Sequence, residues 1–139
     1  MFNPNRVIEN LVSKKQIDAI IVLLSRVLLA YIFIVAGFGK ITAYEATGAY
    51  MEAMGVPSML LPLTILVEFG GGLAILFGFQ TRLAALGLAI FSVITALIFH
   101  GGADDAINLM KNMAIAGGLL MLVQHGASYM SLDQLFEKD

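Results

Sequence analysis

The stretch that decides the fold is IDAIIVLLSRVLLAYIFIVAGFG, residues 17–39. Apart from Asp18, Ser25 and Arg26, almost every side chain in it is apolar or small. About 20 such residues in an α-helix cross the roughly 30 Å hydrocarbon core of a bilayer. The stretch therefore predicts a membrane-spanning helix. We interpret it as an uncleaved signal anchor, because the apolar region of a cleaved signal peptide has only about 7–15 residues and a small-residue cleavage site after it.

Three further apolar stretches follow, at residues 59–78, 83–99 and 107–123. The last two are at the short end of the spanning range, so we expect them to tilt little. Packing all four stretches into a water-soluble core would leave no polar face toward water. The connection at residues 79–82 (FQTR) is short enough to predict a helical hairpin. Together these stretches predict an all-α membrane protein, an antiparallel four-helix transmembrane bundle.

The composition supports the same class of protein. Of 139 residues, 59% are hydrophobic and 13% charged, whereas soluble domains have about 45–50% apolar and about 25% charged residues. The net charge of −2 provides no basic surface for nucleic acid, so the expected partner is the lipid bilayer. The absence of cysteine excludes disulfides, iron–sulfur clusters and thiol catalysis. With only two histidines, no metal site is expected.

The charges outside the spans predict how the chain is organised. We expect an N-terminal segment at residues 1–16, a transmembrane domain at 17–124 and a C-terminal tail at 125–139. Loops with more basic residues stay in the cytoplasm. Five basic residues lie on the side of both termini and two on the other side, which predicts that both termini are cytoplasmic. The five are Arg6, Lys14, Lys15, Arg82 and Lys138, and the two are Lys40 and Lys111.

The connection between the first two spans has a helical pattern of its own. In residues 42–54 (TAYEATGAYMEAM), Glu45 and Glu52 are seven positions apart and share one face. Tyr44 and Tyr50 are residues of the type that anchor a helix at the level of lipid headgroups. The pattern predicts a short amphipathic interfacial helix between helices 1 and 2.

Two ionisable residues fall deep inside the predicted spans, Arg26 and Glu68. Each costs roughly 2.5–3.5 kcal/mol at the centre of a membrane helix, so such residues are usually paired or functional. Counted from the expected helix ends, both lie at a similar depth, which predicts that Arg26 and Glu68 pair. The pair would line a ligand or proton site, or clamp the first two helices together. A further alternative keeps Glu68 neutral.

A second polar cluster is expected at the non-cytoplasmic ends of the helices. It consists of Lys40, His100, Lys111 and Asn112. Amines, an imidazole and an amide over the mouth of a bundle suit an oxyanion or a quinone carbonyl. The alternative is that the two lysines extend to the headgroups and that His100 is an ordinary interfacial residue.

Three polar residues near the C-terminus, His125, Ser128 and Asp133, are side chains of the types found in hydrolase triads. They fall within the short segment 125–139. We expect this segment to be a polar tail with no supporting scaffold, so these residues predict no catalysis. Catalytic residues therefore stay unassigned from the sequence.

Several motifs together resemble the DoxX family of small bacterial membrane proteins. They are Arg26 with FIVAGFGKI (33–41), MGVP (54–57), EFGGGLAILFGFQTR (68–82), FH (99–100) and MKNMAIAGG (110–118). The resemblance spans roughly residues 26–122. It implies a multi-pass protein of the bacterial inner membrane. Founding members of the family are membrane subunits of a thiosulfate:quinone oxidoreductase, which implies quinone chemistry. The positions matching the family's polar pattern are Arg26, Lys40, Glu68, His100, Lys111 and Asn112.

Two classes of function follow from these observations. The first is a quinone-linked or redox-associated membrane subunit with a polar intramembrane site. It would bind quinone without a covalent cofactor and receive electrons from a redox partner protein. The alternative is a non-enzymatic membrane adaptor or a small-molecule transport or permeability protein, since distant eukaryotic relatives look like cargo receptors. Transport would require a homo-oligomer, because four helices are few for alternating access. A third hypothesis is a pure scaffold. Whether the chain is an enzyme stays open.

Overall fold

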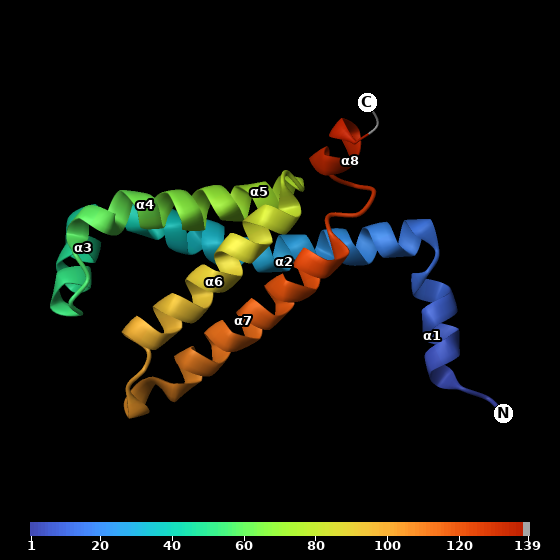
Figure 1. The fold of residues 1–139 in the computed structure, drawn as a ribbon, viewed down its shortest axis with the longest axis horizontal. Coiled ribbons are helices and arrows are strands. Elements are labelled where there is room, and N and C mark those ends of the chain that lie inside the picture. The colour runs from blue at the N-terminus through green and yellow to red at the C-terminus, as the bar shows by residue number, and fades with distance from the viewer. Residues whose placement is uncertain (138–139) are drawn as a thin grey trace.

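A computed structural model describes residues 1–137 of the chain, and every regular element within that range is helical (Figure 1). Lys138, counted above among the basic residues, lies outside the described residues. The elements are α1 (Pro4–Val12), α2 (Lys15–Thr42), α3 (Tyr44–Ala53), η1 (Ser58–Leu60), α4 (Leu61–Ile65), η2 (Leu66–Gly70), α5 (Gly71–Phe77), α6 (Thr81–Phe99), η3 (Ala103–Asp105), α7 (Ala106–His125) and α8 (Leu132–Phe136).

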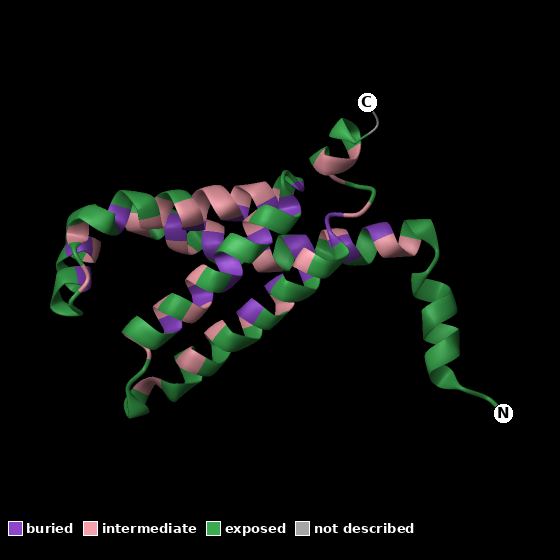
Figure 2. Ribbon diagram, viewed as in Figure 1, coloured by how far each residue is buried: buried purple, intermediate pink, exposed green. Residues whose placement is uncertain are grey.

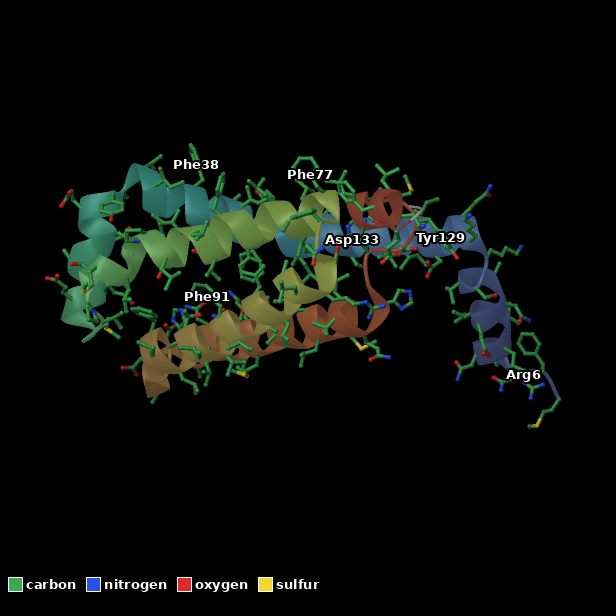
Figure 3. All side chains as sticks on the ribbon, turned by 45° about the horizontal axis from the view of Figure 1, so that its top comes forward. Arg6, Phe38, Phe77, Phe91, Tyr129 and Asp133 are labelled. Atoms are coloured by element: carbon green, nitrogen blue, oxygen red, sulfur yellow. The ribbon has the colours of Figure 1, made fainter. Side chains whose placement is uncertain are left out.

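Four helical segments are long and apolar enough to cross a membrane: Lys15–Thr42, Ser58–Phe77, Thr81–Phe99 and Ala103–His125. Their mean hydropathy lies between 1.5 and 2.6. Much of the outer surface of these segments is exposed and apolar (Figure 2). Phe38 and Phe77, for example, point away from the helices (Figure 3). Such a surface suits lipid rather than water. The predicted all-α membrane class and the four spans are confirmed.

The second span is not a regular α-helix. It combines η1, α4, η2 and α5, and η2 is a π-helical segment, Leu66–Gly70. A π-helical turn holds an additional residue and shifts the faces of the helix on either side of it. Glu68 lies in the middle of this segment and is buried. The irregular turn thus places an ionisable side chain inside the protein.

Helix α2 packs closely against the second span through glycines. A Cβ added at Gly37 would lie 2.7 Å from Phe69 Cβ, and one at Gly72 would lie 3.1 Å from Phe33 Cβ. Small residues of this kind let two helix backbones approach each other in lipid. The two segments run in opposite directions. Gly37, which comes later in α2, lies against Phe69, and Phe33, which comes earlier in α2, lies against Gly72.

Helices α6 and α7 form a second pair that crosses the first one obliquely (Figure 1). The core lies where the pairs meet, and it contains Ala30, Phe33, Ile75, Leu88 and Leu119. At the far end of α6, Tyr50 of α3 stacks on Phe99 with ring centroids 5.6 Å apart. The helix expected at residues 42–54 is present as α3. Through Tyr50 it contacts the end of α6.

The N-terminal segment contains a helix that the sequence analysis did not predict. Helix α1 has Asn3 as its N-cap, with Asn3 Oδ1 accepting from Asn5 N at 3.0 Å, and Pro4 at its first position. No residue of α1 is buried, and the whole helix is exposed in Figure 2. It turns steeply away from the axis of α2 (Figure 1).

Candidate functional site

Arg26 is the largest fully buried side chain, with 1% of its surface exposed. Its guanidinium donates only to backbone carbonyls. Nε donates to Ile75 O at 3.0 Å, and Nη2 donates to Leu76 O at 2.8 Å. Nη1 donates to Ala127 O at 2.9 Å and to Met130 O at 2.7 Å. Arg26 therefore binds the carbonyls at the end of α5 and joins them to the segment that follows α7.

The expected Arg26–Glu68 pair is wrong. Glu68 is seven residues from Ile75, which is about 10 Å along a helix, and Ile75 is where the guanidinium binds. The two residues had been placed at equal depth by counting from the expected ends of their helices. The helices are staggered, so Arg26 lies level with the end of α5 and not with its middle.

Two more charged residues bind helix ends at the same level. Arg82 Nη1 donates to Val123 O and Gln124 O, both at 2.6 Å, in the last turn of α7. Asp133 Oδ2 accepts from Thr81 N at 2.9 Å, so it caps the start of α6 (Figure 3). A carboxylate at a helix N-terminus and a guanidinium at a C-terminus also complement the helix dipole. We call Arg26, Arg82 and Asp133 the capping cluster.

The segment after α7 is supported by the rest of the fold, contrary to the expectation of a tail without a scaffold. Asp18 of α2 holds it: Asp18 Oδ1 lies 3.0 Å from His125 Nε2, and Asp18 Oδ2 accepts from Ser128 Oγ. The serine and the histidine both bind the carboxylate rather than one another. The three side chains therefore do not form the relay of a hydrolase, and their contacts are structural.

Glu68 pairs with Lys40 instead of Arg26. Lys40 Nζ lies 2.6 Å from Glu68 Oε2, and the exposed fractions of the two side chains are 27% and 9%. Oε2 makes no hydrogen bond of standard geometry, so charge attraction dominates the contact. The close packing of Gly37 against Phe69 brings the two helices together one turn away. Unlike the capping cluster, the Lys40–Glu68 pair binds no helix end.

Ser92 of α6, a buried polar residue that the sequence analysis missed, lies at the level of Glu68. A Cβ added at Gly71 would meet the side chain of Leu88 at 3.1 Å. Glu68 lies three residues before Gly71, and Ser92 lies four residues after Leu88. Because the two segments run in opposite directions, both residues lie about one turn to the same side of this contact and share a level. Ser92 is 1% exposed, and its hydroxyl has no hydrogen-bond partner among the described residues. By contrast, Thr95 donates to Phe91 O at 2.8 Å. A serine within an apolar run was the signal available in the sequence.

The remaining predicted site residues lie around η3. His100 Nδ1 contacts Asp105 Oδ2, and Asn108 Nδ2 donates to Asp105 Oδ1 at 2.5 Å. Asn112 Nδ2 donates to Asn108 O at 3.0 Å, and Lys111 is exposed. Within residues 1–137, no hydrogen bond or ion pair joins His100, Lys111 or Asn112 to the Lys40–Glu68 pair. Their role in a shared site stays a prediction.

Comparison with known proteins identifies the family of the chain. The family profile named DoxX matches residues 21–101, more than half of the sequence. The chain belongs to the DoxX family. The resemblance inferred from the motifs is thus confirmed. Among its relatives, the inner membrane protein YqjF of Escherichia coli (strain K12) is 50% identical over 127 residues, covering 89% of this chain and 98% of YqjF.

Two relatives of lower identity differ in what their names imply. The inner membrane protein YphA of Escherichia coli (strain K12) is 31% identical, covering 83% of this chain and 89% of YphA. "Putative oxidoreductase CatD" of Bacillus subtilis (strain 168) is 33% identical, covering 68% of this chain and 75% of CatD. No solved structure matches. The inner-membrane relatives and the four apolar helices make this DoxX protein a multi-pass protein of the inner membrane.

Proposed function

We propose that this DoxX protein is a quinone-linked membrane subunit whose polar site is the Lys40–Glu68 pair. The observation that carries the proposal is the pair itself, which joins the last turn of α2 to the buried Glu68 of the second span at 2.6 Å. Ionisable groups within membrane-spanning helices cost stability and therefore usually have a functional reason. Glu68 also lies on a π-helical turn, an irregularity that is frequent at functional sites.

The groups around the pair fit a quinone carbonyl. Lys40 would donate a hydrogen bond to the carbonyl oxygen, and the Ser92 hydroxyl supplies a second donor at the level of Glu68. Glu68 would hold or release a proton beside them. A bound quinone supplies the capacity to accept electrons together with protons. The chain has no cysteine to hold an iron–sulfur cluster, so a partner protein would deliver the electrons. The name of CatD supports a redox setting.

In the membrane, we propose that the four spans cross as an antiparallel bundle with both termini in the cytoplasm. Helix α3 would then lie at the opposite interface, where Tyr44 and Tyr50 are exposed. A reporter fused after Asp139 tests this orientation. We expect activity from a cytoplasmic reporter such as green fluorescent protein and none from alkaline phosphatase. The reverse result would contradict the orientation.

Quinone retention tests the function directly. The wild-type protein is purified in native-lipid particles and extracted with organic solvent, and the extract is measured by chromatography with ultraviolet detection. We expect quinone in proportion to protein, and its loss in Lys40→Met and Glu68→Gln. Lys14→Met is the matched control, because Lys14 is exposed at the other end of α2. Lys111→Met shows whether the site extends to α7.

The outcome separates the two classes of function. If the wild type yields no more quinone than an empty-membrane preparation, the quinone proposal fails. A non-enzymatic adaptor or a transport protein then describes the chain better. If Lys40→Met and Glu68→Gln retain quinone as the wild type does, the pair is not the site.

A further inference from the structure

Helix α1 has an apolar face that no part of the described chain covers. Val7, Ile8, Leu11 and Val12 lie on one side of Pro4–Val12 and are all exposed. The opposite side carries the polar residues Arg6, Glu9 and Asn10. A helix of nine residues is marginal in water on its own. Contact with a further apolar surface would therefore stabilise this helix.

A groove lies between α1, α2 and α7. Its volume is about 740 Å³. From Asp18 to Leu29 it follows eleven residues of α2, or about 16 Å of helix. This is close to half of the roughly 30 Å hydrocarbon core of a bilayer, the depth of one leaflet. The walls of the groove are mostly apolar, and they include Val12, Ile21, Val22, Leu28, Met121 and Leu122.

The polar groups of the groove gather at one end. Glu9, Ser13, Asp18 and His125 line it where α1 meets α2 and α7 ends. Asp18 is already bound to His125 and Ser128. Glu9 makes no ion pair with any residue in 1–137 and is exposed. Two carboxylates and one imidazole therefore favour a cation at this end over an anion.

We propose that this groove binds one phospholipid of the adjacent leaflet, with a primary-amine headgroup at Glu9. An acyl chain would run along Ile21 and Leu29, and Val12, at the end of the apolar face of α1, would cover the start of the chain. The lipid would thus contact α1 through Glu9 and Val12. This inference does not depend on quinone binding or on the Lys40–Glu68 pair.

Native mass spectrometry of the intact protein tests the headgroup. The detergent-solubilised protein is mixed with equal amounts of phosphatidylethanolamine and phosphatidylglycerol that carry the same acyl chains. We expect the wild type to retain one phosphatidylethanolamine at about tenfold preference, since hydrogen bonds to charged groups discriminate strongly. Glu9→Gln should lose this preference, and Glu45→Gln, an exposed glutamate on α3, should keep it. Equal retention of the two lipids by the wild type would overturn the proposal.

A second pair of variants tests the groove itself. Ser25 lines the groove from α2, and its hydroxyl binds only Ile21 O of its own helix. Ser25→Trp should fill the groove and abolish retention of both lipids. Val35→Trp, also exposed on α2 but outside the groove, should retain lipid as the wild type does. Wild-type retention by Ser25→Trp would show that lipid binds elsewhere. Because α1 buries no residue, Glu9→Gln leaves the core intact and decides the headgroup independently.

Discussion

The charged residues at the two ends of the helix bundle bind different kinds of partner. In the capping cluster, Arg26 gives all of its hydrogen bonds to backbone carbonyls, and Asp133 accepts from backbone N–H groups. At the other end, Lys40 and Glu68 bind each other, and Glu68 Oε2 has no further hydrogen bond. The charges of the capping cluster bind backbone groups at helix ends, whereas Lys40 and Glu68 bind only each other.

This difference teaches how to separate structural from functional charges in a membrane protein. A charge that satisfies helix ends replaces hydrogen bonds that lipid cannot provide, so it stabilises the fold. A side-chain ion pair adds little stability relative to an apolar pair of similar size. The Lys40–Glu68 pair therefore needs another explanation, such as binding. The following predictions test this contrast from the largest expected effect to the smallest.

Arg26→Met should have the largest effect on stability. Hydrogen bonds to charged groups contribute about 1.5–3 kcal/mol each, and this variant removes four and leaves buried carbonyls unpaired. We expect the free energy of unfolding to fall by at least about 3 kcal/mol. Arg26→Lys should rescue it poorly, because an ammonium lacks the planar fork of the guanidinium. Unfolding titrations in mixed micelles measure this. If the unfolding midpoint of Arg26→Met equals that of the wild type, Arg26 does not stabilise the fold, and the distinction between structural and functional charges fails.

Gly37→Ala should be the next most damaging change. The new Cβ would lie 2.7 Å from Phe69 Cβ and 2.9 Å from Phe69 Cα, so α2 must move away from the π-helical turn. Overpacking of this kind costs about 1–3 kcal/mol. Gly39→Ala is the matched control, since nothing lies within 4 Å of its added Cβ. The control should be neutral or slightly stabilising in the same titration. Equal effects of the two variants would show that the close approach is unimportant.

Asp133→Ala should destabilise the protein by about 1 kcal/mol, the usual cost of losing an N-cap. Asp133→Asn should retain much of the stability, because the amide oxygen still accepts from Thr81 N. Asp104→Ala provides a control on an exposed aspartate. Thermal unfolding of the three variants measures the ranking. If Asp133→Ala unfolds together with the control, the segment after α7 does not stabilise α6.

The double variant Lys40→Met with Glu68→Met should change stability least. Replacing an ion pair by apolar residues is often neutral, so we expect a difference from the wild type within about 1 kcal/mol. Each single variant should be less stable than the double variant, because it leaves one charge without its partner. The double variant should also retain no quinone. A loss as large as that of Arg26→Met would make the pair structural and would erase the contrast.

Much of the fold was accessible from the sequence, because membrane spans are a local property. Hydropathy located all four spans, and helical spacing located α3 at Tyr44–Ala53. The sequence also contained unread signals. Asn3 followed by Pro4 is a typical helix start, and it predicts α1. Ser131 with Gln134 three residues later is a capping-box pattern, and Ser131 Oγ does accept from Gln134 N in α8.

The partners of the charges were harder to predict. Arg26 binds carbonyls, which every residue carries, so its partners leave no trace in the sequence. The pairing of Lys40 with Glu68 depends on the stagger of α2 against the second span. That stagger arises from the contact of Gly37 with Phe69, a long-range packing event that helix lengths do not reveal.

The contacts of Arg26 also bear on biosynthesis. Two of its carbonyl partners, Ala127 and Met130, follow it by 101 and 104 residues. The first span therefore leaves the ribosome and enters the bilayer long before these partners exist. Until the second span supplies Ile75 and Leu76, the guanidinium must be tolerated without its carbonyl partners, at the insertion cost of roughly 2.5–3.5 kcal/mol. Final closure of the bundle is consequently a late event, which follows translation of residue 130 and separates insertion of the helices from their assembly.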